Sequence, residues 1–141
     1  MEIHRVGPEE VWDLRHRVLR NGQARALAMW PGDDSALHWA LIDGEERCAV
    51  LSIFPTPQGP APWQLRGMAV APERQRQGLG LSLLLAVEQW MFHEYPGQSI
   101  WCNARTSAVD FYERAGWSRV GEPFEIAGVG PHLRMRREPA P

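Results

Sequence analysis

The sequence predicts a mixed α/β domain in which helices cover one central sheet. The main observation is the order of the expected elements: after a first helix come three strands, and then helix, strand, helix and two strands. A length of 141 residues fits one domain, residues 1–141, that can bury a core of its own. The hydrophobic share of 44% and the charged share of 23% are ordinary for a globular protein.

The first helix is expected over residues 7–22. Pro8 and the two glutamates after it favour a helix start, and Asn21 and Gly22 favour its end. Apolar residues between them recur at spacings of three and four, as on one face of a helix. Residues 23–34 are expected to form a loop or a short, irregular helix, because their sequence is mixed and ends in PGDD.

Three strands are expected next. Residues 37–43 and 47–55 lie on either side of a turn that begins with Asp43 and Gly44, which predicts a hairpin. A proline-rich loop follows, and residues 63–72 form the third expected strand. The glycine in the middle of that strand indicates a β-bulge or a close approach of another backbone.

Helices and strands alternate in the second half of the chain. Apolar residues at helical spacing predict a long helix over residues 78–94, which the sequence YPG ends. A strand over residues 99–104 and a helix over residues 106–116 are expected to follow. Two more strands, over residues 117–126 and 131–137, complete the expected sheet.

Composition argues against several classes of function. The net charge of −2 disfavours a broad nucleic-acid-binding surface, and no apolar run approaches the ~20 residues that span a bilayer. Cys48 and Cys102 lack the spacing of metal ligands or of a disulfide framework, so no metal site is expected. The N-terminus lacks the apolar core of a signal peptide. We therefore expect a cytoplasmic protein without membrane or nucleic-acid partners.

Two glycines stand one residue apart in the segment ERQRQGLGLSLLL, directly before a run of leucines. Each glycine inside a helix costs roughly 0.5–1 kcal/mol relative to alanine, although a purely structural helix entry stays open. The free amides at a helix N-terminus also bind anions. A Rossmann fingerprint would need a small residue where the chain has Leu83, and a P-loop would need a lysine, which the chain lacks. These glycines therefore indicate anion binding of another kind.

Two blocks of the sequence resemble the GNAT N-acetyltransferase superfamily. The acetyl-coenzyme A loop of that superfamily is similar to the segment Gln75, Arg76, Gln77, Gly78, Leu79 and Gly80, which follows the strand RGMAV and Pro72. A later strand and helix of the family resemble WCNARTSAVDFYERAGW, with Asn103, Phe111, Tyr112, Gly116 and Trp117 at the matching positions. The resemblance covers essentially the whole chain, with its specific motifs within residues 65–117.

The resemblance implies that acetyl-coenzyme A is the co-substrate and that no metal takes part. Its pyrophosphate would lie on successive amides of residues 76–80, where side chains at positions 78 and 80 would obstruct it. Its pantetheine arm would pair with the strand around residues 68–70, and Gly67 would form a bulge that opens a slot for the thioester. Structural explanations remain open for Gly67, Asn103 and the loop arginines. The cofactor-binding residues so implied are Met68, Ala69, Val70, Gln75, Arg76, Gln77, Gly78, Leu79, Gly80, Asn103 and Phe111.

Tyr112 matches the position of the general acid of the family, which gives a proton to the departing thiolate; a core aromatic is the competing interpretation. A backbone amide of residues 68–70 would hold the oxyanion. The base is where the chain departs from the family, because the strand WQLRGMAV lacks the glutamate that many relatives carry. Candidates are Glu122, Glu125 and His132, and His132 is preferred as base or substrate contact. A water chain or an acceptor amine of low pKa would remove the need for a base.

The expected enzyme transfers an acetyl group from acetyl-coenzyme A to a primary amine by direct attack. A small-molecule acceptor is favoured, and a homodimer is allowed. Cys102 is the one candidate for a covalent intermediate, but no activating partner is evident. A non-catalytic module that binds or senses acyl-coenzyme A is the alternative from a different class. Acidic residues at positions 33, 34, 122 and 125 would favour a cationic amine, although loop carboxylates usually face solvent.

Overall fold

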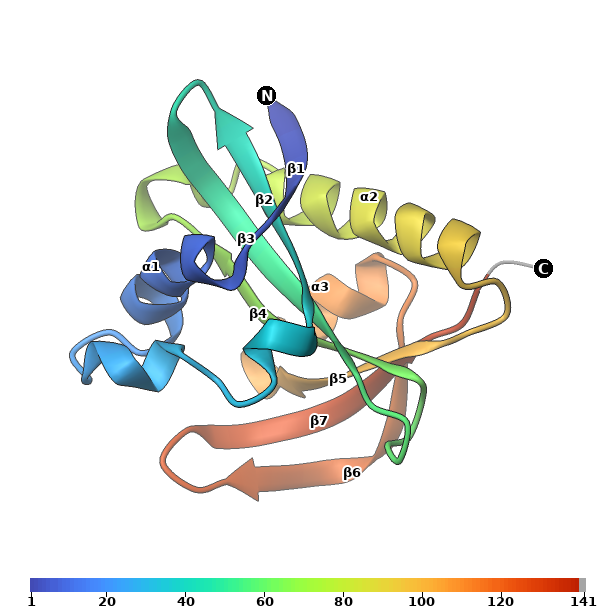
Figure 1. The fold of residues 1–141 in the computed structure, drawn as a ribbon. Coiled ribbons are helices and arrows are strands. Elements are labelled where there is room, and N and C mark those ends of the chain that lie inside the picture. The colour runs from blue at the N-terminus through green and yellow to red at the C-terminus, as the bar shows by residue number, and fades with distance from the viewer. Residues whose placement is uncertain (140–141) are drawn as a thin grey trace.

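A seven-stranded mixed sheet forms the centre of the computed structural model, which describes residues 1–139 (Figure 1). The strands lie in the order β1-β2-β3-β4-β5-β7-β6, and every neighbouring pair is antiparallel except β4 and β5. This single α/β domain confirms the predicted fold class. The strands are β1 (Glu2–Val6), β2 (Leu37–Asp43), β3 (Glu46–Pro55), β4 (Trp63–Val70), β5 (Ile100–Arg105), β6 (Ser118–Ile126) and β7 (Gly130–Arg137).

Helices cover both faces of the sheet. On one face lies α1 (Trp12–Leu14), which continues as the helical turn Arg15–Leu19. On the other face lie the long helix α2 (Leu79–Glu94) and the short helix α3 (Val109–Arg114) (Figure 1). The remaining helical turns are Pro8–Glu10, Arg25–Ala28, Asp33–Ser35, Pro72–Arg74 and Thr106–Ala108.

Alternation along the strands divides the core into two layers, because successive side chains of a strand point to opposite faces. Leu51 of β3 packs in the larger layer with Leu83 and Leu84 of α2. Its neighbour Val50 packs in the smaller layer with Leu14 of α1. Burying both faces fixes the register of the central strands and holds β4 between the two layers of helices.

The predicted elements are confirmed apart from their ends, with two differences. The first helix is three short helical pieces between residues 8 and 19 rather than one regular helix. Strand β1 was not predicted. It is an edge strand that pairs only with β2, and most of its side chains are exposed, so it lacks the alternation of a strand with one buried face.

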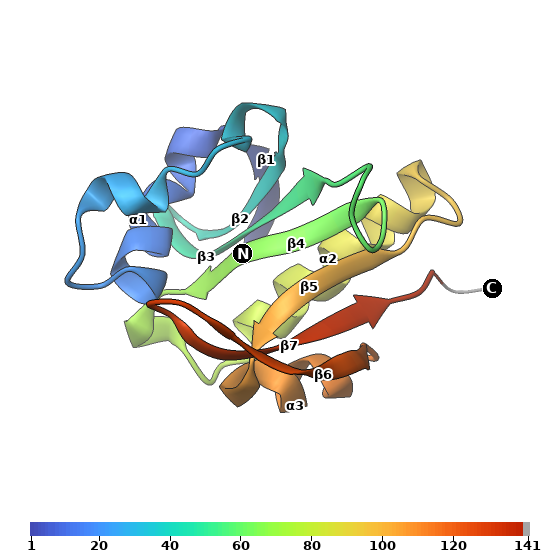
Figure 2. The same cartoon turned by 90° about the horizontal axis from the view of Figure 1, so that it is seen from below.

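The two central strands part after a short parallel contact. β4 and β5 pair only at Trp63 with Ile100 and at Gln64 with Trp101, and they diverge beyond this point (Figure 2). This splay was expected from the resemblance and is confirmed. It leaves backbone groups of β4 without a partner strand on the β5 side.

The predicted bulge at Gly67 is also confirmed. Ser52 of β3 pairs with Arg66, and Val50 pairs with Ala69, so β4 has one residue more than β3 in this interval. Gly67 has a φ of +69°, which a side chain rarely tolerates. A Cβ atom there would also lie 2.9 Å from the Arg15 Nε atom. Glycine is therefore needed both for the bulge and for the packing of Arg15 over it.

No helix within residues 1–139 is long and apolar enough to cross a membrane. The same residues contain no group of three or more His, Cys, Asp or Glu side chains placed to hold a metal ion. Cys48 and Cys102 are both buried free thiols.

Candidate active site

Two cavities lie along β4. The slot cavity, about 410 Å³, is lined by residues 64–68 of β4 and residues 102–105 of β5, where these strands part. The loop cavity, about 560 Å³, is lined by residues 74–76 and 78–81 at the start of α2. Residue 68 of β4 lines the slot cavity and residue 70 lines the loop cavity, so the two follow the same strand. The two cavities therefore lie one after the other along β4.

The start of α2 presents backbone amides to the loop cavity. Gly78 precedes the helix with a φ of +78°, and Arg76 also has a positive φ, +65°. No side chain caps this helix start, so the first N–H groups of α2 keep their capacity to bind a ligand. Free amides and the helix dipole together favour an anion such as a phosphate group.

Gly80 has a different reason for lacking a side chain. A Cβ atom at this position would lie 3.2 Å from Met68 Cε and 3.2 Å from Val70 Cγ2, both on β4. Gly80 thus lets the first turn of α2 pack directly on β4, the strand that both cavities follow. The clash expected from a side chain at position 80 is with this strand, whereas the space beside Gly78 is open.

Three arginines line the loop cavity, and they differ in their partners. Arg74 is held by the carboxylates of Asp43 and Glu46 on the β2–β3 hairpin. Arg76 and Arg114 have no carboxylate within 4.0 Å among residues 1–139. These two guanidinium groups are therefore available to a phosphate-bearing ligand.

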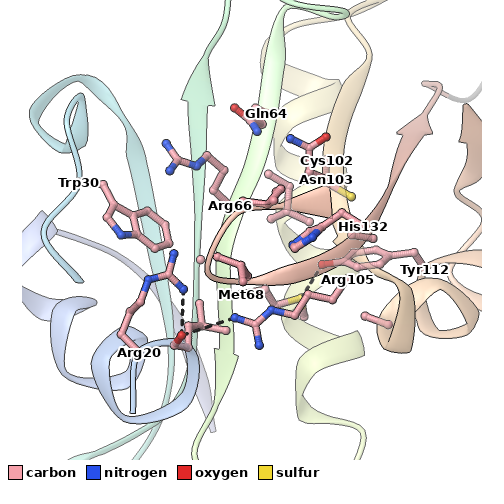
Figure 3. A pocket seen from close by; sticks show the side chains of 17 residues that line it. Arg20, Trp30, Gln64, Arg66, Met68, Cys102, Asn103, Arg105, Tyr112 and His132 are labelled. Carbon is pink, nitrogen blue, oxygen red and sulfur yellow. Dashed lines mark hydrogen bonds between the residues drawn. The ribbon is translucent and has the colours of Figure 1, made fainter. Parts of the chain in front are cut away.

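Tyr112 reaches the slot cavity from α3 (Figure 3). Its side chain is buried, and its hydroxyl lies 3.8 Å from Met68 Sδ. Burial raises the pKa of the Tyr112 phenol above its ordinary value, with a smaller contribution from Cys102. The phenol is therefore protonated at neutral pH, and its O–H can donate into the cavity.

His132 of β7 lines the same cavity and lies on the same side of β4 as Tyr112 (Figure 3). Its Nδ1 atom lies 2.8 Å from the carbonyl oxygen of Gly130. A carbonyl oxygen only accepts hydrogen bonds, so the neutral ring carries its proton on Nδ1. The second ring nitrogen, Nε2, then keeps a free lone pair that can accept a proton.

Asn103 of β5 lines the slot cavity with an unsatisfied acceptor. Its Oδ1 atom is buried and has no hydrogen-bond partner among the described residues. Buried side-chain oxygens are nearly always bonded, so this atom indicates a ligand N–H group. The amides of a pantetheine arm are donors of this kind.

The backbone of β4 also offers polar groups to a ligand. The N–H of Ala71 donates to the carbonyl of Cys48 on β3, at 2.8 Å. Because successive residues of a strand direct their backbone groups to opposite sides, those of Val70 point away from β3. Gln75 Nε2 accordingly reaches the Val70 carbonyl from the loop, at 3.2 Å. The N–H of Val70 then faces the side on which β5 has parted.

The structure brings most of the predicted site residues to one cavity or the other. The slot cavity takes in Met68, Asn103, Tyr112 and His132. The loop cavity takes in Val70, Gln75, Arg76, Gly78, Leu79, Gly80 and Phe111.

Two predicted cofactor residues and two candidate bases lie elsewhere. Ala69 is buried in the core layer beneath α1, and Gln77 is exposed and lines neither cavity. Glu122 and Glu125 are exposed on β6 and also line neither cavity. Of the three candidate bases, only His132 is thus in place to meet a substrate in the slot.

Cys102 lines the slot cavity, but its thiol is unsuited to nucleophilic attack. The side chain is buried, and this burial raises the pKa of the Cys102 thiol to about 12. The reactive species is the thiolate, which is scarce at neutral pH in such surroundings. The cavity therefore offers no activated cysteine.

Arg15 was not predicted to belong to the site, yet it supports one wall of the slot. Its guanidinium is fully buried and donates to Asp33 Oδ2 at 2.9 Å and to Ser52 Oγ at 3.0 Å. It also lies 3.9 Å from the ring centroid of Trp30, which lines the slot cavity. The expectation that the loop carboxylates face solvent is wrong for Asp33, because this residue is the counter-charge of Arg15.

Sequence reasoning also missed the arginines of the slot cavity. Arg20, Arg66 and Arg105 line it from three separate segments, with Trp30 between the first two. No motif joins these positions. The one local signal is that Arg66 stands directly before the glycine of the predicted bulge.

The arrangement defines a class of protein, the acyltransferases that use coenzyme A thioesters. The chain belongs to the GNAT acetyltransferase family, whose domain matches residues 7–139, and it is an N-acetyltransferase that uses acetyl-coenzyme A. The residues of both cavities are of the kinds that suit this co-substrate: uncapped amides and guanidinium groups without a carboxylate partner suit phosphates, and an unsatisfied side-chain oxygen suits an amide.

The chain is similar to YitI of Bacillus subtilis, an uncharacterized N-acetyltransferase, with 29% identity over 96% of this chain and 94% of that protein. Among solved structures it is similar to Escherichia coli ElaA, with a TM-score of 0.80, 21% identity and coverage of 97% of this chain and 99% of that one. An aminoglycoside 6'-N-acetyltransferase complexed with coenzyme A matches with a TM-score of 0.78 and 17% identity, over 100% and 98% of the two chains. The two structural likenesses support the fold.

Proposed function

We propose that the protein transfers the acetyl group of acetyl-coenzyme A to the primary amine of a small molecule by direct attack. The observation that carries this proposal is the placement of Tyr112 and His132 in one cavity at the parting of β4 and β5. A protonated phenol can give a proton as an acid, and an imidazole with a free lone pair can take one as a base.

In this proposal the co-substrate lies along β4. Its phosphates occupy the loop cavity, on the amides at the start of α2 and beside Arg76 and Arg114. Its pantetheine amides meet the Asn103 side chain and the free edge of β4, as an added strand would. Its thioester then reaches the slot cavity, where the N–H of Val70 is a candidate donor to the oxyanion.

The chemistry needs two proton transfers. The amine lone pair attacks the thioester carbon and forms the C–N bond, while the C–S bond breaks and its electron pair leaves on sulfur. His132 Nε2 takes the extra proton of the attacking nitrogen, and Tyr112 gives its hydroxyl proton to the departing thiolate. The products are an amide and free coenzyme A thiol, and exchange with water restores both side chains.

Direct attack is favoured over an acyl-enzyme because the cavity lacks an activated nucleophile. Cys102 is the only cysteine that lines the slot among the described residues, and burial keeps its thiol protonated. The chain also has no lysine that could form an acyl-lysine intermediate. The amine itself is then the group that meets the thioester.

The test combines binding, turnover and intact mass. We expect acetyl-coenzyme A to raise the melting temperature, because it binds only the folded state. A panel of primary amines should then release free thiol, whereas the protein mixed with acetyl-coenzyme A alone should show no acetylated mass. Unchanged melting at millimolar acetyl-coenzyme A would refute the binding mode, and a stoichiometric acetylated protein would refute direct attack.

A further inference from the structure

The slot cavity is lined by arginines and by no acidic side chain among the described residues. Three arginines line it: Arg20 follows the helical turn after α1, Arg66 lies on β4, and Arg105 ends β5. None of the described residues that line this cavity is an aspartate or a glutamate. The slot cavity, which is proposed to receive the acceptor, thus has positive side chains from three different segments of the chain.

These three arginines lack the partners that other arginines of the chain have. On the outer surface Arg119 pairs with Glu113 at 3.0 Å, and Arg17 pairs with Glu73 at 3.2 Å. In the slot cavity no carboxylate within residues 1–139 lies within 4.0 Å of any of the three guanidinium groups. The nearby carboxylate of Asp33 is bonded to Arg15 instead.

Two of the cations converge on one carbonyl. Arg20 Nη1 donates to the carbonyl oxygen of Leu19 at 2.8 Å, and Arg105 Nη2 reaches the same oxygen at 3.5 Å (Figure 3). Burial, and then the charge of Arg105, lowers the pKa of Arg20. Like charges held this close repel each other, and a bound anion would remove that cost.

Arg66 is held in place by stacking. Its guanidinium carbon lies 4.6 Å from the Trp30 ring centroid and 4.8 Å from the Phe54 ring centroid. A guanidinium stacked on aromatic rings keeps its N–H donors free at its edge and loses little mobility on binding. The cavity therefore contains an ordered fork for an oxyanion as well as two further cations.

We infer that the acceptor is a small amine that also carries an anionic group, a carboxylate or a phosphate, which Arg20, Arg66 and Arg105 hold in the slot cavity. This inference rests on the proposed acetyl transfer and names the substrate class of that same site. A forked guanidinium matches the geometry of both anions. A polycationic acceptor is disfavoured, because it would meet three unpaired positive charges.

The three arginines of the slot cavity also affect the protonation of the acceptor amine. An acceptor amine must lose its proton before it attacks, and nearby guanidinium groups disfavour the ammonium form. The slot thus favours the neutral amine without a carboxylate on β4. A glutamate there would pair with the arginines and compete with the anionic group of the acceptor.

Stable conjugates of coenzyme A test the inference without requiring turnover. Coenzyme A is joined through a thioether-acetyl link to β-alanine or β-alaninamide, and to 2-aminoethyl phosphate or ethanolamine. Within each pair the members differ in the anionic group. Titration calorimetry should show that an anionic member binds at least tenfold more tightly than its neutral partner. The pair that shows the preference identifies a carboxylate or a phosphate acceptor.

Variants locate the effect. Arg66→Gln and Arg105→Gln should each reduce the preference below threefold, while Arg119→Gln on the outer surface should keep it. Arg105 is exposed, so its substitution leaves packing intact even if Arg66→Gln lowers the melting temperature. Unconjugated coenzyme A should bind all variants equally well.

The outcomes separate the two proposals. Equal affinity within both pairs would overturn the anionic acceptor while leaving acetyl transfer in place, and so would a preference that survives both slot variants. Failure of all four conjugates and of free coenzyme A to bind would instead overturn the proposed function, because all of them share the coenzyme.

Discussion

The hydroxyl of Tyr112 on α3 lies 3.8 Å from the sulfur of Met68 on β4, and both residues line the slot cavity. This contact brings the one buried phenol of the described chain to the strand along which the thioester is proposed to lie. In the proposed complex, the coenzyme sulfur would lie close to Met68 and therefore within reach of the Tyr112 hydroxyl.

Tyr112→Phe should lower kcat by roughly 10²-fold, because it deletes the proton donor and keeps the ring. Affinity for acetyl-coenzyme A should change by less than ~1 kcal/mol, about the net contribution of one hydrogen bond. The loss should appear equally in kcat and kcat/KM. The matched control is Tyr95→Phe, since Tyr95 lines neither cavity. Wild-type turnover by Tyr112→Phe would leave Tyr112 as a core aromatic only.

His132→Gln should lower kcat by about 10²-fold at neutral pH, because glutamine cannot take the proton from the attacking amine. Its amide can still donate to the Gly130 carbonyl, so the melting temperature should change little. His93→Gln is the control, because His93 is exposed near the end of α2. Full activity of His132→Gln with a good acceptor would show that water or the amine itself supplies the base.

Cys102→Ala should keep more than half of the activity, because direct attack needs no thiol. Cys48→Ala, at the other buried free cysteine, controls for the cost of a small cavity in the core. Both variants should be compared by rate and by melting temperature. A hundredfold loss confined to Cys102→Ala, with the fold preserved, would point to an acyl-enzyme and contradict direct attack.

Gly80→Val should lower the free energy of unfolding by about 1–3 kcal/mol, as overpacking of a core contact does. Its side chain would press on Met68 and Val70, which lie 3.2 Å from the position of a Cβ atom. Binding of acetyl-coenzyme A should weaken as well, because both cavities adjoin these residues. Urea unfolding and calorimetry measure the two effects. Unchanged stability would show that the contact at Gly80 relaxes freely.

Asp33→Asn should lower the free energy of unfolding at pH 7 by about 3–5 kcal/mol, because Arg15 loses its buried counter-charge. Burial alone would raise the pKa of Asp33, but hydrogen bonds from Arg15, Trp30 and Trp12 and the charge of Arg15 hold it below its usual value. Ionised Asp33 therefore stabilises the fold above its unfolded pKa of roughly 4.

That stability is lost as the pH falls through the lowered pKa of Asp33. The difference in free energy of unfolding between wild type and Asp33→Asn should therefore become smaller in acid. Urea titrations between pH 7 and pH 2 measure this difference in free energy of unfolding. Asp34→Asn, at the exposed neighbouring residue, should have the same free energy of unfolding as wild type. A difference between wild type and Asp33→Asn that stays constant over the whole range would contradict the role of the ionised carboxylate.

The sequence allowed prediction of features that depend on neighbours along the chain. Helix α2 was predictable because its apolar residues repeat at helical spacing, and the bulge at Gly67 because glycine interrupts a strand pattern. Strand β1 was not, since its side chains are mostly exposed and pairing with β2 defines it. The glycine at position 80 was predicted to leave room for a phosphate, but its contact with Met68 depends on how α2 lies on β4 and was not predictable.

Charges inside the site were the least predictable feature. Arg15 looks like a surface residue of a short helix, and only the folded loop brings Asp33 to it. Arg20, Arg66 and Arg105 belong to three segments that the sheet gathers around one cavity. Sequence patterns describe which side of an element is apolar, but they do not show which charges from distant elements will meet.

The parting of β4 and β5 gives the sheet its weakest cohesion in the middle rather than at its edges. The halves β1–β4 and β5–β7 share two residue pairs of backbone contact. A pantetheine arm in the gap would pair with β4 as an added strand. Binding of the coenzyme would therefore stabilise the association of β1–β4 with β5–β7. We therefore expect the protein's lifetime in the presence of proteases to follow the supply of acetyl-coenzyme A, because the bound form opens less often.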